Sequence, residues 1–321
     1  MKKLLSFLLL GATLLMLLTG CGYASTREES EPVFSLMGYD VPYEVYRFYA
    51  MSAKASYGLL DEDGNTRTDD AGLLANAEKA AMESIYNLYA ALSVGEKLGF
   101  HIDDKNVVYE AESYFNSLKD SYESESAFRT DMKAAYMNKS VVMLVYGASY
   151  IENEAYQRAR ENGTILQDEA SVRAFFESDE LIRVKHILIQ PSIFTNAKEM
   201  ADIAYKKALA AENFDTVYKL YRDSGIYTED RYMARGETYE SFEDAAFALT
   251  VGQLAPLTET AAGYSVFVRY EKDPAAFEKD KKTFTEQYSL YQFNRLLEDA
   301  KTHADLQYYD AYDQHPFAEI K

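Results

Sequence analysis

The apolar periodicity of this 321-residue chain changes twice along its length, and these changes limit the folds that it can adopt. From Leu73 onward apolar residues recur at three- and four-residue spacings, which is typical of amphipathic helices. At RVKHILI, residues 183–189, the pattern becomes a branched apolar run, which predicts a strand. After about residue 272 the helical spacing returns. The pattern therefore predicts an α+β multidomain protein, in which a mostly helical body holds an inserted α+β unit.

The last helical segment supports this arrangement. Its apolar stripe, which includes Phe284, Tyr288 and Tyr291, is more than a small α+β unit can easily cover, so we expect it to return to the helical body. The predicted segments are a lipoprotein signal peptide at 1–20, a flexible tether at 21–32, a helical domain at 33–178, the α+β unit at 182–272, and a C-terminal helix that packs on the helical domain at 273–321.

The first residues have the composition of an export signal. Two lysines precede an apolar run, residues 4–18, which is shorter than the about 20 residues of a membrane-spanning helix. The run ends at LTGC, which resembles the lipobox of bacterial lipoproteins, and Cys21 is the only cysteine. We expect Cys21 to be lipidated and to anchor the protein on the extracytoplasmic face of a bacterial membrane. The alternative is an export signal cut near Ala24, which would remove this cysteine.

The composition excludes several classes of function. A net charge of −19 without a basic stripe argues against binding to nucleic acid, whose phosphates attract cations. The four histidines are scattered, with none at metal-ligand spacing, so we expect no metal and no cofactor. DEDGNTRTDD, residues 61–70, is acidic, but its glycine position and missing final glutamate do not fit an EF-hand loop.

Residues 182–272 resemble the parvulin family of peptidyl-prolyl isomerases. VKHIL at 184–188 is similar to the family's opening strand, and ARGETYESFEDAAFALTVGQLAP at 234–256 fits the family's central pattern closely. The whole chain is similar to extracytoplasmic foldases of the PrsA and SurA type, through the lipobox, the helical N-terminal domain and the C-terminal helix. The resemblance implies a parvulin fold, cis–trans isomerisation of X-Pro bonds, and unfolded or newly secreted polypeptides as partners.

The resemblance also implies a catalytic set. His186 matches the first of two active-site histidines, and Ser265 stands where the family has the second. Ser224 lies about where the family has aspartate or cysteine. With its usual partner replaced, we expect His186 to bond a serine hydroxyl or a tyrosine such as Tyr264.

Three further residues are implied to bind the substrate. Phe242 matches the aromatic residue that lines the proline-ring pocket, Thr238 falls where methionine is usual, and Met233 replaces another aromatic residue. Rotation about an X-Pro bond breaks no bond, and its barrier of about 18–20 kcal/mol is lost amide resonance. An apolar cup around the ring, with donors aimed at the rotating carbonyl, therefore suffices for catalysis.

The sequence leaves alternatives open. His186 fits equally a buried histidine that stabilises the sheet, and Phe242 lies in an apolar helix stripe that predicts core packing. For the whole chain the alternatives are a non-catalytic holdase with a degenerate parvulin domain, and a solute-binding or structural envelope lipoprotein. The 28 tyrosines and 10 methionines would suit unfolded clients only where a concave cluster is exposed. A homodimer is compatible with each of these functions.

Overall fold

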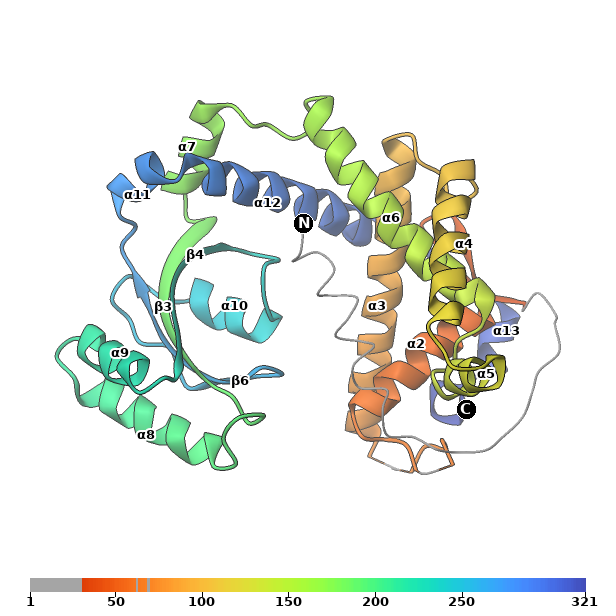
Figure 1. The fold of residues 1–321 in the computed structure, drawn as a ribbon, viewed down its shortest axis with the longest axis horizontal. Coiled ribbons are helices and arrows are strands. Elements are labelled where there is room, and N and C mark those ends of the chain that lie inside the picture. Colours follow the sequence, from red (N-terminus) through yellow and green to blue (C-terminus); the bar gives the residue numbers. More distant parts are fainter. Residues whose placement is uncertain (1–30, 62, 68–69) are drawn as a thin grey trace. The chain divides into compact units, whose positions relative to one another are not determined.

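The computed structural model describes residues 31–61, 63–67 and 70–321, so the expected signal peptide and Cys21 lie outside the described residues. The chain is an α+β multidomain protein, as the sequence predicted, and it forms two compact units (Figure 1). The first unit contains the described residues up to Ala159 together with Leu296–Lys321, and the second is Arg160–Arg295. Within the described ranges, no helix combines the length and the apolar character that crossing a membrane requires.

Helices dominate the first unit. Its elements are β1 (Pro32–Leu36), β2 (Tyr39–Pro42), α2 (Tyr43–Ser56), α3 (Ala71–Lys97), α4 (Lys105–Asp120), α5 (Glu125–Ala134), α6 (Lys139–Glu161), the end of α12 (Lys281–Thr302), β7 (Leu306–Tyr308), α13 (Asp310–Asp313) and the 3-10 helix η1 (Phe317–Glu319). The strands form an antiparallel sheet in the order β2-β1-β7, which was not expected in a helical domain. The C-terminal strand β7 has only three residues, too few to show a period in the sequence.

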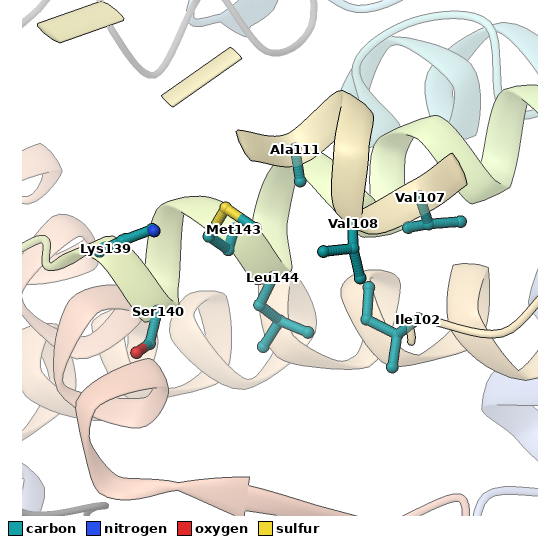
Figure 2. A pocket seen from close by; sticks show the side chains of 8 residues that line it. All are labelled: Ile102, Val107, Val108, Ala111, Lys139, Ser140, Met143 and Leu144. Carbon is teal, nitrogen blue, oxygen red and sulfur yellow. The ribbon is translucent and has the colours of Figure 1, made fainter. Parts of the chain in front are cut away.

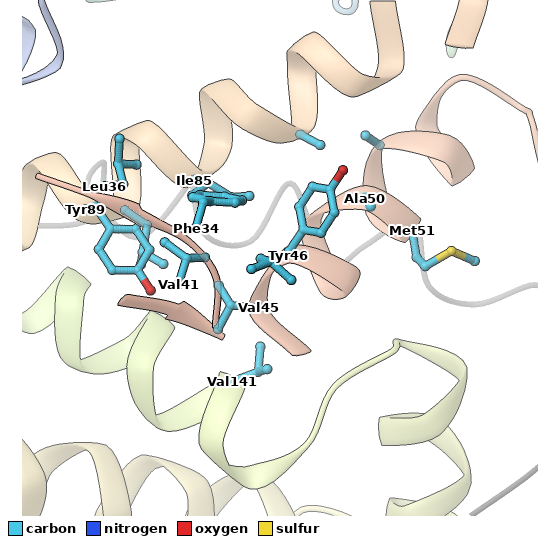
Figure 3. Packing of buried hydrophobic residues seen from close by; sticks show 14 of the residues in the cluster. Phe34, Leu36, Val41, Val45, Tyr46, Ala50, Met51, Ile85, Tyr89 and Val141 are labelled. Carbon is cyan, nitrogen blue, oxygen red and sulfur yellow. The ribbon is translucent and has the colours of Figure 1, made fainter. Parts of the chain in front are cut away.

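The core of the first unit packs this sheet against α2, α3 and α6 (Figure 3). A two-residue turn, Met37 with φ 54° and Gly38 with φ 85°, joins β1 to β2. Positive φ at both positions is the backbone that a tight hairpin requires. Phe34 of β1 pairs with Tyr308 of β7, and their rings meet edge to face at 5.8 Å. Phe34 meets Tyr46 of α2 in the same way, so one aromatic residue links both ends of the chain to a helix.

The second unit is a four-stranded antiparallel sheet with helices on both faces (Figure 1). Its elements are α7 (Glu169–Glu177), β3 (Leu181–Ile189), α8 (Ala197–Ala210), α9 (Phe214–Asp223), β4 (Tyr227–Ala234), α10 (Glu240–Phe247), β5 (Thr258–Thr260), β6 (Gly263–Tyr270), α11 (Pro274–Lys279) and the first part of α12. The strand order is β4-β3-β6-β5. Ile187 and Ile189 of β3 pack with α8 and α9, whereas Ile182 and Val184 pack with α10. The alternation of β3 therefore places His186 on the α10 face.

The helix α12 is divided between the two units. Phe284 is buried near Phe176 of α7, with ring centroids 4.8 Å apart, and Tyr288 stacks on Phe175 at 4.9 Å. The helices α7 and α11 thus cover the apolar stripe that we expected to pack on the helical domain. The borders between the units therefore fall in α6 and α12, rather than near residues 180 and 272.

Gly95 allows α3 to approach α6 closely. A Cβ atom on Gly95 would lie 2.1 Å from Cγ2 of Ile151, a branched side chain that is fully buried. We predict that Gly95→Ala lowers the free energy of unfolding of the first unit by about 1–2 kcal/mol. Overpacking costs about 1–3 kcal/mol, a severe overlap with a buried branched side chain lies in the upper part of this range, and the better helix propensity of alanine offsets about 1 kcal/mol of that loss. Hydrogen exchange of peptides from α3 and α6 measures the change.

Gly72→Ala, in the first turn of the same helix, is the matched control. The added Cβ atom would lie 3.2 Å from Oδ1 of Asp70, and a shift of a few tenths of an ångström by this exposed side chain relieves the contact while it keeps the hydrogen bonds that it accepts from the N–H groups of Gly72 and Leu73. We expect this change to alter stability by less than about 0.5 kcal/mol. Equal exchange rates in Gly95→Ala and wild type would contradict the close approach of the two helices.

Candidate functional site

His186 lies in the middle of the second unit's sheet. On β3 it is opposite Glu229 of β4 and Phe267 of β6. Only 8% of its surface is exposed. A polar ring in this position needs a hydrogen-bond partner, because burying an unpaired polar group costs free energy.

Ser265 is this partner. It lies on β6, opposite Leu188 of β3, and is 1% exposed. Its Oγ is 2.9 Å from Nε2 of His186. In one neutral tautomer Nε2 accepts a hydrogen bond from the hydroxyl group, and in the other its N–H donates one to Oγ. Both tautomers therefore keep the hydrogen bond between His186 and Ser265. Of the two partners that the sequence left open, the structure thus selects a serine rather than Tyr264.

Burial keeps this histidine neutral. Loss of hydration, together with the nearby positive charge of Arg231, lowers the pKa of His186 to about 3. At neutral pH the side chain is therefore an uncharged hydrogen-bonding group. Arg231 is held by Glu229 at 3.5 Å and by Glu237 at 2.9 Å, so ion pairs fix the charge beside the histidine. Sequence reasoning missed Arg231, although the alternation of β4 places it on the same face.

Aromatic side chains enclose the pair. The ring of Phe242 on α10 lies 4.8 Å from the imidazole of His186 and 4.4 Å from the ring of Phe267. Phe242 is 4% exposed, and Met233 is fully buried in the same cluster. The structure thus brings four predicted residues together. In this conformation Phe242 and Met233 fill the space between α10 and the sheet, which is where a proline ring would need an open cup.

Thr238 lies half-buried in the loop between β4 and α10. The carboxylate of Glu243 holds this loop, because it accepts hydrogen bonds from the backbone N–H groups of Gly236, Glu237 and Thr238 at distances of 2.8 to 2.9 Å. Glu243 is 5% exposed, and its three donors compensate for the lost hydration. Glu243 was not among the expected site residues. An acidic residue within the apolar stripe of α10 was the sequence signal that could have indicated it.

Ser224 does not join this cluster. It follows the last residue of α9, where its side chain is exposed and its hydroxyl donates to the carbonyl of Leu220 at 2.8 Å. The strand β4 begins at Tyr227, so Ser224 also precedes the sheet pairing. A serine that bonds a carbonyl four residues earlier stabilises the end of its helix.

The first unit carries an apolar groove between α4 and α6 (Figure 2). This α4–α6 groove has a volume of about 370 Å³. Its lining residues are Ile102, Val107, Val108, Ala111, Lys139, Ser140, Met143 and Leu144. Val108 is 37% exposed, so the groove offers an apolar surface that is both concave and accessible. Such a surface is the condition under which the sequence predicted a client site.

Close helix packing and a charged rim define the two ends of the groove. A Cβ atom on Gly147 of α6 would lie 2.7 Å from Cδ1 of Ile102, so a small residue is needed there. Eight residues earlier, Lys139 lies 5.5 Å from the ring centroid of Phe115 and 3.6 Å from the carboxylate of Glu112. The groove thus combines an apolar floor with a polar, exposed rim.

The two sites can support different chemistry. The His186 cluster offers a neutral hydrogen-bonding ring, a hydroxyl and aromatic walls, which suit non-covalent contacts rather than proton transfer. The α4–α6 groove offers mainly apolar contact, with Lys139 and Ser140 as its polar lining residues. Among the residues that the structure describes, no group of three or more His, Cys, Asp or Glu is placed to hold a metal ion.

The low pKa of His186 makes stability depend on pH. An unfolded chain protonates this histidine below about pH 6.5, whereas the folded chain does so only below about pH 3. The unfolded state therefore binds more protons in this window, and the free energy of unfolding falls as the pH falls through it. We predict that between pH 6.5 and pH 4 wild type loses about 3 kcal/mol more than His186→Gln, since each pH unit contributes about 1.4 kcal/mol.

Urea unfolding of both proteins at pH 7, 5.5 and 4, followed by circular dichroism, measures this difference. His303→Gln is the control for the loss of a histidine at the surface, because the side chain of His303 is 74% exposed. Parallel pH profiles for wild type and His186→Gln would show that the histidine is hydrated in solution.

Comparisons with known proteins give similarity at the level of solved structures. No protein-family model matches the chain, and no curated protein matches it. The structure of PrsA from Bacillus subtilis is 20% identical, with 72% of this chain and 84% of that chain covered and a TM-score of 0.26. The foldase protein PrsA from Streptococcus pneumoniae is 19% identical, with 76% and 96% covered and a TM-score of 0.30. A SurA-like chaperone from Campylobacter jejuni is 12% identical, with 88% and 100% covered and a TM-score of 0.29. The chain is thus similar to PrsA- and SurA-like foldase chaperones, at low identity and low TM-score.

Proposed function

We propose that this protein is an extracytoplasmic folding factor that binds unfolded segments of secreted polypeptides. The observation that carries the proposal is the α4–α6 groove, a concave and accessible apolar surface. Client side chains that enter the groove leave water, and full burial of a large apolar side chain contributes about 1.5–3 kcal/mol. One segment therefore binds with modest affinity, which suits a protein that must release its clients.

The lining of the groove suits segments of different shape. Met143 has an unbranched, polarisable side chain that adapts to different apolar partners. Lys139 can lay its methylene stem along the bound segment while its ammonium group stays in water. Neither contact selects one sequence, so the groove favours broad client recognition.

The N-terminal sequence supports the proposed location. The export signal and the lipobox-like LTGC sequence predict a lipid on Cys21, which would hold the protein at the outer face of a bacterial membrane. There the groove would meet polypeptides soon after export, while they are still unfolded. The lipid anchor and a homodimer stay predictions.

Val108→Asp tests the groove. We predict that this change reduces the suppression of client aggregation several-fold, because a carboxylate in the apolar lining must lose its hydration when a client binds. The measurement is light scattering after a denatured client protein is diluted into buffer that contains residues 22–321. Met143→Gln, at a second lining position, should act in the same direction.

Tyr109→Asp is the matched control, since Tyr109 is the next residue of α4, is 68% exposed and does not line the groove. It should suppress aggregation as wild type does. If Val108→Asp and Met143→Gln also suppress aggregation fully while remaining folded, clients bind elsewhere and the proposal fails.

A second candidate function is isomerisation of X-Pro bonds by the second unit. It is favoured by the bond between His186 and Ser265, which joins neighbouring strands beside Phe242 as the paired histidines of parvulins do. Bond rotation needs apolar surroundings and a donor but no base, so a neutral histidine is sufficient. Because Phe242 is already packed against the sheet, we expect slow catalysis.

Thr238→Met tests this candidate without disturbing the core. It restores the methionine that is usual at this half-buried position in parvulins, so we predict a several-fold rise in the rate of X-Pro isomerisation. A protease-coupled proline-peptide assay measures the rate. Thr302→Met, at an exposed position of α12, is the control and should change nothing. If neither wild type nor Thr238→Met exceeds the uncatalysed rate, the isomerase function is excluded and the chaperone function is unaffected.

A further inference from the structure

A second concavity lies in the first unit, between the first turns of α3 and the C-terminal segment that follows α13. Its volume is about 470 Å³. Leu74 of α3 and Pro316 and Phe317 of the C-terminal segment contribute apolar surface to it. We call it the α3–C-terminal groove. It shares no lining residue with the α4–α6 groove.

The charged side chains that line this groove are both acidic. Its two ionisable carboxyl groups belong to Glu78 and Asp313, and no lysine, arginine or histidine lines it. Tyr312 donates a hydrogen bond from its hydroxyl to Oε1 of Glu78, at 3.1 Å, which holds that carboxylate at the groove. The side chain of Asp313 is exposed. An apolar floor beside two carboxylates is complementary to a cation that carries apolar neighbours.

A buried lysine fixes the wall of the groove. Lys54 of α2 is fully buried, and its Nζ donates to Thr66 Oγ1 at 2.9 Å and to the carbonyl oxygens of Ala318 and Ile320 at 3.4 and 2.8 Å. It also lies 5.1 Å from the ring centroid of Phe317. Burial lowers the pKa of Lys54 to about 8, so the ammonium form still predominates at neutral pH. The wall is therefore formed before a ligand arrives, and binding does not have to order it.

We propose that the α3–C-terminal groove binds segments of unfolded polypeptide in which a lysine or arginine stands beside apolar residues. The inference rests on the proposed chaperone function and names the class of client that this second groove selects. Apolar side chains contact Leu74 and Phe317, while the cation lies between Glu78 and Asp313. The two carboxylates mainly favour cationic over anionic segments and raise the association rate of the cationic ones. Their contribution to affinity is small, because they are near the surface and salt screens them.

The test uses residues 22–321 and three fluorescein-labelled peptides that share a leucine and phenylalanine centre. The flanks are lysine in the first peptide, glutamine in the second and glutamate in the third. Fluorescence anisotropy at low salt is expected to show at least fivefold tighter binding of the lysine peptide than of the glutamate peptide. This preference should fall towards unity in 0.5 M salt, where the screening length is only a few ångströms.

Asp313→Asn and Glu78→Gln each remove one carboxylate, and together they should abolish the preference while the glutamine peptide still binds. The single variant Asp313→Asn should stay folded, because its position is exposed. It therefore tests the role of one carboxylate even if Glu78→Gln loosens the packing of Tyr312. Glu83→Gln is the matched control on α3, at an exposed position outside the groove, and should retain the full preference.

Two outcomes would overturn the inference: equal affinity of wild type for all three peptides, or an equal preference in the Asp313→Asn, Glu78→Gln double variant. Both leave the chaperone function intact if aggregation is still suppressed and Val108→Asp still weakens that suppression. If wild type neither binds any peptide nor suppresses aggregation, both the proposed function and this inference fail.

Discussion

The pairing of β7 with β1 holds the first unit together, because it joins two parts of the chain that are separated by the whole second unit. Closing a long insertion costs little more entropy than closing a short one, since the cost grows only with the logarithm of its length. The contacts of Tyr308 with Phe34 and of Lys54 with the last carbonyls therefore suffice to fix the C-terminal segment. The α3–C-terminal groove exists only because this return places Tyr312 and Phe317 beside α3.

Burial determines the role of His186, the histidine of the predicted strand. The two faces of β3 pack against helices, so His186 is largely removed from water and its charged form is disfavoured. Ser265 satisfies the ring, and Phe242 covers it. The same contacts that stabilise the sheet thus remove the open cup that a proline ring requires. A structural role and weak catalysis are compatible here, because both use a neutral, hydrogen-bonded imidazole.

The sequence predicted those features that depend on local pattern. The branched run of β3 was sufficient to place His186 in a strand, and the resemblance to parvulins associated it with Phe242 of the central motif and Ser265 of the closing strand. Features that depend on packing between elements far apart in the sequence were not predictable. The short strand β7 shows no period, and the nine residues of α7 gave no sign that they would cover α12. Ser224 was expected in the catalytic set only because of its position in the chain relative to the family. In the structure it lies at the end of α9, before β4 begins.

The apolar side chains beside His186 and those that line the two grooves differ in how far neighbouring side chains cover them. In the second unit Met233, Phe242 and Phe267 are buried between α10 and the sheet. In the first unit two concavities have apolar side chains in their lining, one between α4 and α6 and one between α3 and the C-terminal segment. Unfolded polypeptides bind where apolar surface is accessible rather than where it is abundant. We therefore assign the proposed client binding to the two grooves of the helical unit.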